Sequence, residues 1–187
     1  MLGTRGLLMP GVIVALAVFV AGGRSEENPS AKMTLKSPAF ENNRLIPLRH
    51  TGDGEDYSPP LEWSGVPDGT KELALICDDP DAPRREPWVH WVIYRIPADV
   101  AGLKEGIERS ERLADPLGAR QGRNSWNTIG YRGPAPPRHR GPHHYHFKLY
   151  ALDAELALEP GLDKNKLLAA MKGHILAETK LVGIYER

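Results

Sequence analysis

Cysteine is nearly absent from the 187-residue sequence, which contains Cys77 alone. A single cysteine excludes an internal disulfide, so the fold must be held by a packed core, for which the 41% hydrophobic content is sufficient. Cys77 ends the apolar run from Leu73 to Ile76. We therefore interpret it as a small buried hydrophobe and not as a reactive thiol.

An excess of charge of one sign is also lacking, because 24 Lys and Arg face 24 Asp and Glu. This balance gives no electrostatic footprint for a nucleic acid, and we expect no nucleic-acid partner. The clusters Arg84-Arg85 and Arg138-His139-Arg140 are interpreted as solvated loop charge.

Motifs for catalysis are missing as well: Gly-x-Ser-x-Gly, His-Glu-x-x-His and a phosphate loop do not occur. An Asp–His pair can do acid–base chemistry, but no nucleophile accompanies one, and Ser125 beside Trp126 is only a mild candidate. We expect a binding protein and not an enzyme.

Histidines are dense near residue 140, at His139, His143, His144 and His146. In a strand, His144 and His146 would point to the face opposite His143, so few of them would share one site. We expect no metal and no cofactor.

Long hydrophobic runs are limited to Leu7–Val20, which is short for a membrane span and follows Arg5. Small residues end it at Ala21-Gly22-Gly23, as before a signal peptidase site. The pattern predicts a signal peptide over 1–23, a leader over 24–32 and one domain over 33–187. The protein would then be periplasmic or secreted; the alternative is an uncleaved anchor.

Proline and glycine, by contrast, are abundant, with 17 and 19 residues, which favours a turn-rich, mainly β fold. The periodicities predict a helix capped by Asp163 and reaching about residue 178. Strands are expected over 33–35, 45–48, 58–63, 71–77, 88–96, 143–150 and 180–185. No βαβ alternation occurs, so we predict a two-sheet antiparallel β-sandwich with a C-terminal helix.

An acidic, proline-containing stretch follows the strand over 71–77: Asp78-Asp79-Pro80-Asp81-Ala82-Pro83. Aspartate and proline are poor strand formers, so the strand should stop after Cys77 and the chain should turn. Ala82-Pro83 and Glu86-Pro87 are candidates for cis peptide bonds. We interpret this rigid turn as one wall of a small ligand pocket.

Three segments supply polar groups that can converge on such a pocket: Asp79 with Asp81, His90, and His143 with Tyr145. Imidazolium, phenol and spare backbone N–H groups around Gly133 are donors suited to a phosphate or carboxylate oxygen. The aspartates are compatible with an anion if one accepts the His90 N–H and keeps the ring cationic, or if the ligand is zwitterionic.

Structural interpretations of the same residues stay open. His90 lies among tryptophans, as a hydrogen-bonded core histidine would. Asp79 and Asp81 can simply accept backbone N–H groups of their own turn. Alternation over 88–96 places His90, Val92, Tyr94 and Ile96 on one strand face.

Taken in order, four segments resemble the phosphatidylethanolamine-binding protein family, which includes the Raf kinase inhibitor protein: 79–83, Trp88-Val89-His90-Trp91, 130–137 (Gly-Tyr-Arg-Gly-Pro-Ala-Pro-Pro) and His143-His144-Tyr145. The segments 58–63 and 181–185 are similar to its bacterial branch. The resemblance covers about residues 33–187.

This resemblance implies a β-sandwich with a small anion pocket and cis peptides near the acidic turn. Family members bind phosphate, acetate or phosphoethanolamine-type groups. The implied ligand-binding residues are Asp79, Asp81, Pro83, Trp88, His90, Gly133, Ala135, His143 and Tyr145. Two positions depart from the family: His144 stands where arginine is common, and Ala135 where glycine or cysteine is.

The sequence therefore predicts an exported, non-enzymatic protein that binds small anionic or zwitterionic head groups. One alternative is a protein-binding inhibitor, for instance of an exported protease, that acts through the pocket rim and the breaker-rich loop over 120–142. A weaker alternative is a hydrolase that uses Asp79 and His90. An exported protein would meet no cytosolic kinase.

Overall fold

Two β-sheets build the protein, whose computed structural model describes residues 1–3 and 32–187. The larger sheet has the order β2 (Arg44–Leu45), β9 (Ile175–Tyr185), β8 (His143–Leu152), β4 (Glu72–Asp79), β5 (Trp88–Pro97) and β7 (Arg120–Gln121). The smaller sheet has the order β1 (Thr34–Lys36), β3 (Leu61–Ser64) and β6 (Gly102–Leu103). A 3-10 turn, η1 (Leu48–His50), and one helix, α1 (Lys164–Met171), complete the described elements.

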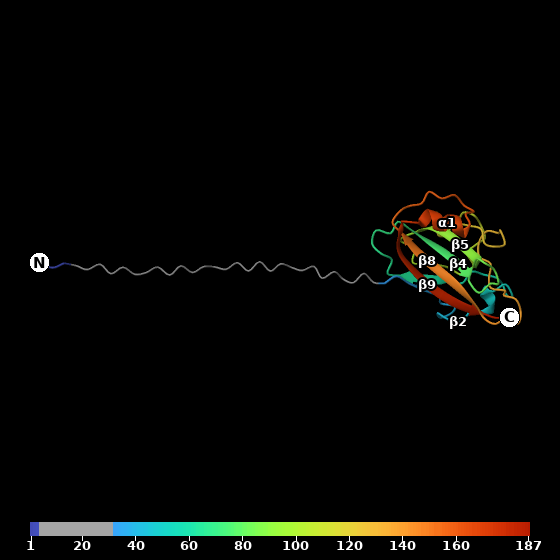
Figure 1. Ribbon diagram of the computed structural model, residues 1–187. Coiled ribbons are helices and arrows are strands. Elements are labelled where there is room, and N and C mark those ends of the chain that lie inside the picture. The colour runs from blue at the N-terminus through green and yellow to red at the C-terminus, as the bar shows by residue number, and fades with distance from the viewer. Residues whose placement is uncertain (4–31) are drawn as a thin grey trace.

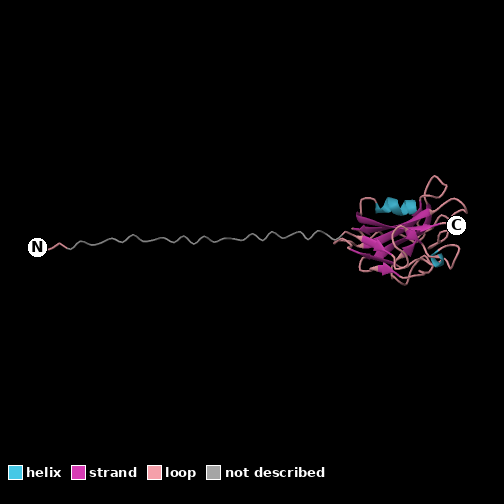
Figure 2. Ribbon diagram, turned by 90° about the horizontal axis from the view of Figure 1, so that it is seen from below, coloured by secondary structure: helices cyan, strands magenta, loops and turns pink. Residues whose placement is uncertain are grey.

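Both faces of the larger sheet are covered. On one face an inter-sheet cluster joins Leu35 and Trp63 of the smaller sheet to Leu75, Trp91 and Phe147. On the other face a helix-side cluster joins the sheet to α1, which Figures 1 and 2 show lying across the strands; its members include Ala74, Ile76, Val92, Tyr94, Leu167 and Met171. Each large apolar side chain buried in this way contributes about 1.5–3 kcal/mol. The predicted mainly β, two-sheet fold with one helix is confirmed.

The central strand β4 is buried along its whole length, because β5 and β8 flank it and each of the two clusters covers one of its faces. It runs two residues further than predicted, through Asp78 and Asp79. Hydrogen-bonded pairing with both neighbours outweighs the low strand propensity of aspartate at these positions.

Strand β8 alternates as predicted, with His143, Tyr145, Phe147 and Leu149 buried. It runs antiparallel to β4, so the last residues of β4 and the first residues of β8 lie side by side at the same end of the strands. Asp79 is thereby brought beside the first residues of β8.

Strict alternation over 88–96 is wrong, because β5 contains two bulges opposite β4. His90 is an extra residue between Val89 and Trp91, and a second extra residue lies between Ile93 and Ile96. As a result Ile96 joins the inter-sheet cluster, whereas Val92 and Tyr94 lie on the helix side.

The helix is shorter than predicted. It begins after the Asp163 cap as expected, but ends at Met171, and Gly173 has a positive φ of 87°. Residues from Ile175 onward pair with β8 as strand β9. A second departure is the parallel pairing of β2 with β9 in an otherwise antiparallel sheet.

The only cis peptide bond between residues 32 and 187 is Asp115-Pro116. The expectation of a cis bond at Ala82-Pro83 or Glu86-Pro87 is therefore wrong. Among the described residues, no helix has the length and apolar character needed to span a membrane. The predicted signal peptide and leader lie outside the described residues, except for residues 1–3 and 32.

Candidate functional site

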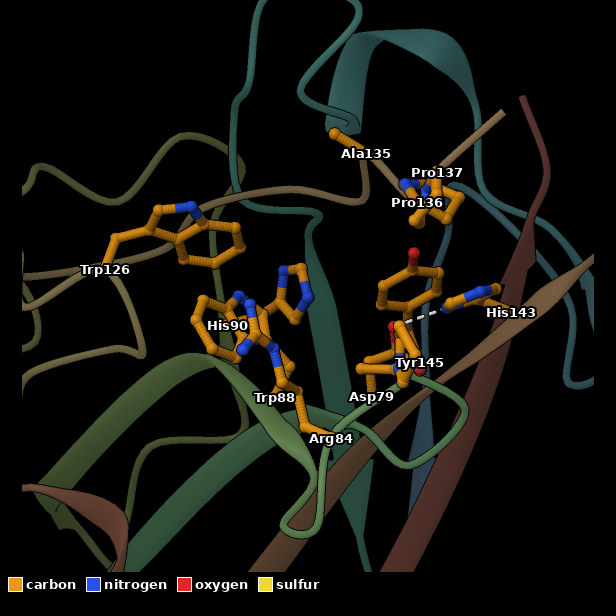
Figure 3. Close-up of a pocket in the computed structure, with 12 residues that line it drawn as sticks. Asp79, Arg84, Trp88, His90, Trp126, Ala135, Pro136, Pro137, His143 and Tyr145 are labelled. Atoms are coloured by element: carbon orange, nitrogen blue, oxygen red, sulfur yellow. Dashed lines mark hydrogen bonds and ion pairs between the residues drawn. The ribbon is translucent and has the colours of Figure 1, made fainter. Parts of the chain in front are cut away.

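A cavity of about 170 Å³ opens at the end of the larger sheet where β4 ends and β5 and β8 begin. Figure 3 shows its lining side chains, which come from the turn after β4, the first residues of β5 and β8, and the loop that precedes β8. They are Asp79, Ala82, Pro83, Arg84, Trp88, His90, Trp126, Ala135, Pro136, Pro137, His143 and Tyr145.

Asp79 and His143 form a buried pair at the base of the cavity. Nδ1 of His143 lies 2.7 Å from Oδ2 of Asp79, and both residues are only 4% exposed. The other carboxylate oxygen, Oδ1, accepts the backbone N–H of Asp81 at 2.8 Å. Both oxygens of Asp79 are thus engaged, and the carboxylate fixes the His143 ring and the following turn together.

His90 is held by a different group. Its Nδ1 lies 2.5 Å from the carbonyl oxygen of Arg132, and the residue is 2% exposed. Burial lowers the pKa of His90 to about 4, although its bond to the Arg132 carbonyl and the carboxylate of Asp79 act in the opposite direction. The first of the two conditions under which the aspartates would be compatible with an anion is therefore not met: no carboxylate accepts the His90 N–H, because Asp79 pairs with His143 instead.

Aromatic rings surround His90 on two sides. Trp126 lies edge-on at 5.0 Å between ring centroids, and Tyr145 lies edge-on at the same distance. Trp126 also meets Trp88 in a T-shaped contact at 5.2 Å. Burial raises the pKa of the Tyr145 phenol, so its hydroxyl keeps its proton and is available as a donor.

Three polar atoms of these buried side chains have no protein partner within the described part of the chain: Oη of Tyr145, Nε2 of His90 and Nε2 of His143. The solvent-inaccessible side-chain atoms without a partner there are Nε of Arg120 and Nε of Arg187. The three atoms are therefore reached by solvent, and since their residues line the cavity, they are reached through it.

Two arginines stack on the tryptophans of the site. The Arg84 guanidinium lies 5.4 Å from the Trp88 ring centroid, and that of Arg132 lies 4.6 Å from the Trp126 centroid. Arg84 is exposed on its loop, in agreement with its interpretation as solvated loop charge, and it also lines the cavity. Trp126 was missed as a lining residue because nothing in the sequence shows that its loop folds back onto His90.

Seven of the nine residues that the sequence predicts for the site line the cavity: Asp79, Pro83, Trp88, His90, Ala135, His143 and Tyr145. Asp81 does not, because its Oδ2 accepts the backbone N–H of His144 at 2.8 Å and lies 2.7 Å from Nδ1 of the same residue. That ligands bind to these residues stays a prediction.

Gly133 also lies outside the lining set. Its N–H donates to Oδ1 of Asp56 at 2.6 Å, so the expected spare backbone donor is already used. A Cβ at this position would lie 2.5 Å from the carbonyl oxygen of His50, which explains why glycine is required.

Cys77 and His144, two further residues that the sequence singles out, do not line the cavity. Cys77 is 1% exposed, and burial raises the pKa of its thiol well above the usual value. On β8, the His144 side chain follows His143 and points to the other face of the strand, where it pairs with Asp81. Over residues 1–3 and 32–187, no three His, Cys, Asp or Glu side chains are grouped as a metal site would require.

Comparison with known proteins identifies similar chains along almost the whole domain. The family model for phosphatidylethanolamine-binding protein matches residues 36–186. The UPF0098 protein of Methanothermobacter thermautotrophicus is 55% identical over 155 residues, which are 83% of this chain and 99% of that protein. A UPF0098 protein of Pyrococcus horikoshii is 44% identical over 182 residues, covering 96% of this chain and 89% of that protein.

Two solved structures share the fold. YbcL of E. coli, described as a new member of the mammalian PEBP family, superposes with a TM-score of 0.79 at 32% identity, covering 84% of this chain and 99% of YbcL. The phosphatidylethanolamine-binding protein homolog CT736 of Chlamydia trachomatis superposes with a TM-score of 0.75 at 42% identity, covering 83% of this chain and 98% of CT736.

Proposed function

The chain belongs to the phosphatidylethanolamine-binding protein family, and on that premise we propose that it is an exported, non-enzymatic binding protein for phosphate- or phosphoethanolamine-type groups. One observation carries this proposal: three buried side chains, His90, His143 and Tyr145, turn polar atoms without protein partners toward one small cavity. Polar atoms that converge on one small cavity, with no protein partner of their own, favour a polar ligand there.

The size of the cavity supports a small ligand. At about 170 Å³ it is smaller than the roughly 300–1,000 Å³ of sites for drug-sized molecules. A phosphate or carboxylate group with a short substituent is the matching class. Whole lipids or nucleotides would have to leave most of their atoms outside.

The charges are compatible with an anion. Asp79 would repel one if it were free, but its two oxygens are engaged by His143 and by the backbone N–H of Asp81. Arg84 brings a positive charge to the wall of the cavity. The Tyr145 hydroxyl adds a neutral donor for an anion oxygen.

We also propose that the protein is not an enzyme, and the hydrogen-bond partners of the candidate catalytic residues support this. Asp79 and His90 do not form the pair that a hydrolase would use, because each has another partner. Ser125 uses its Oγ to accept the Val89 N–H at 2.8 Å and is not among the lining residues.

Titration calorimetry with phosphoethanolamine and with inorganic phosphate tests the proposal on wild type and Tyr145→Phe. The variant removes only the hydroxyl, and losing its bond to an anion should weaken binding by about 1.5–3 kcal/mol. Tyr150→Phe is the matched control, since Tyr150 lies on the same strand but in the helix-side cluster. Equal affinity of wild type and Tyr145→Phe would reject the site.

A second candidate is the protein-binding inhibitor, favoured by the exposed residues around the cavity. Arg84, Arg138 and Arg140 are all exposed and lie on the loops that supply the lining. Such a surface suits an acidic segment of a protein partner. Affinity capture from a periplasmic extract, with an Arg84→Ala/Arg138→Ala/Arg140→Ala variant as control, distinguishes this candidate, which requires one stoichiometric partner that the variant loses.

A further inference from the structure

The proton on the His90 ring can be assigned from its contacts. A carbonyl oxygen only accepts hydrogen bonds, so Nδ1, at 2.5 Å from the Arg132 carbonyl, must carry a proton and donate it. If the ring is neutral, Nε2 then carries a lone pair and no proton.

The surroundings of His90 keep the ring neutral. It lies between Trp126 and Tyr145, as Figure 3 shows, and is 2% exposed. The acids nearby are Asp79 and Asp78 on β4 and Asp56 on the loop before β3, and each raises the pKa. Burial outweighs all of them and leaves the pKa of His90 at about 4.

The cavity therefore offers an acceptor as well as donors. Tyr145 keeps its hydroxyl proton and donates, whereas Nε2 of His90 accepts. A fully deprotonated anion has only acceptor atoms, and it would place an oxygen lone pair against the lone pair of Nε2. A proton between the two removes this conflict and supplies one more hydrogen bond.

We propose that the pocket binds its anion together with one proton, held between an anion oxygen and Nε2 of His90, and that it therefore prefers phosphate monoesters to phosphodiesters. This inference rests on the proposed function and assigns its ligand class. Binding takes one proton from solvent together with the anion, and no other covalent bond is made or broken.

The preference follows from ligand chemistry. A phosphate monoester has a second pKa of about 6, so near neutral pH a fraction of it still carries a P–OH group that can donate to Nε2. A phosphodiester has no such proton. His90 itself would have to become an imidazolium in a buried, aromatic environment, which is the form that burial disfavours.

The test compares phosphoethanolamine, a monoester, with glycerophosphoethanolamine, a diester with the same ethanolamine group. Calorimetric titrations at pH 8 in two buffers of different ionisation enthalpy count the protons bound with each ligand. We expect uptake of about one proton per phosphoethanolamine, and an association constant that falls about tenfold per pH unit above pH 7. The diester should bind at least about tenfold more weakly at pH 7.

Two variants locate the proton. His90→Phe replaces the imidazole with a ring that has no nitrogen and should abolish the proton uptake, whereas His174→Gln should retain it, because His174 pairs with Asp153 away from the cavity. Proton uptake that persists in His90→Phe would overturn the assignment to His90 and would point to His143, whose Nδ1 faces Asp79 and whose Nε2 faces the same cavity. The wild-type proton count stands as a test by itself if that variant does not fold.

The outcomes separate the two proposals. Binding of both esters with similar affinity and without proton uptake overturns this inference and leaves the proposed function intact. Binding of neither ester and of no inorganic phosphate between pH 5 and pH 9 overturns the proposed function, and this inference with it.

Discussion

At the scale of single residues, the surroundings of His90 differ strongly from those of a histidine in water. It donates through one nitrogen to Arg132, lies between two aromatic rings and is nearly inaccessible. The sequence predicts both a core histidine and a site histidine at this position, and the structure shows that it is buried and also lines the cavity.

The lowered pKa of His90 predicts that acid destabilises the protein. The unfolded chain takes up a proton near pH 6.5, whereas the folded protein takes it up only near pH 4. Stability is therefore lost as the pH falls from about 6.5 to about 4, by up to about 3 kcal/mol. Urea unfolding at several pH values measures this slope. It should be reduced in His90→Gln, with a remainder from His146, whose pKa burial also lowers.

His174→Gln is the control for this slope, because it removes a histidine that forms only a surface pair with Asp153; it should change the slope by less than His90→Gln does. An identical slope in wild type and His90→Gln would contradict the assignment of the effect to His90.

The sequence predicts most of the residues that line the cavity, but it does not predict which groups these residues bond to. The converging polar residues and the resemblance name seven of the lining residues correctly. The partners depend on how loops fold: Asp79 pairs with His143 and not with His90, and Gly133 donates to Asp56. These contacts join residues more than forty positions apart, which no local pattern specifies.

At the scale of elements, the errors arise where tertiary pairing overrides local periodicity. Bulges in β5 shift its alternation, so the apolar pattern of 88–96 fits both faces of a strand buried on two sides. Residues 175–178 fit the apolar stripe of a helix, but Gly173 ends α1 and β8 offers a pairing edge. Periodicity alone cannot choose between these arrangements.

Helix α1 is attached to the sheet by a buried ion cluster. The carboxylate of Asp78 on β4 is fully buried, and it accepts from Nζ of Lys148 on β8 at 3.0 Å and from Nζ of Lys164 on α1. Either lysine alone can still compensate the charge, but removing both leaves a buried carboxylate without a partner.

We therefore expect Lys148→Met/Lys164→Met to lose about 3–5 kcal/mol of unfolding free energy, more than the sum of the two single variants. Chemical denaturation of the four proteins completes the cycle. Lys166→Met is the control, because Lys166 is exposed on the same helix and should cost less than about 1 kcal/mol. Strict additivity would show that Asp78 finds another partner or becomes protonated.

At the scale of the whole molecule, composition, periodicity and the lack of βαβ alternation together predict the observed two-sheet β fold with one late helix. They could not predict the strand order, since β2 and β9 are far apart in the sequence yet pair in parallel. Likewise, which sheet each strand joins depends on contacts between distant segments.

The N-terminal segment predicts that the protein is exported and that its signal peptide is removed. We expect cleavage after Gly23, so that the mature protein begins at Arg24. Intact-mass analysis of the protein recovered from the periplasm or medium of an expressing bacterium measures this. A mass that includes residues 1–23 would instead indicate the uncleaved anchor.

The position of β9 has a consequence for the order of events during synthesis. This strand is the last one along the described chain, yet it lies inside the larger sheet, between β2 and β8. Until it leaves the ribosome, β8 has an open edge and β2 has no partner, so the nascent chain cannot complete its sheet. For a protein exported as we propose, the complete sheet can therefore form only after the C-terminal strand has been made.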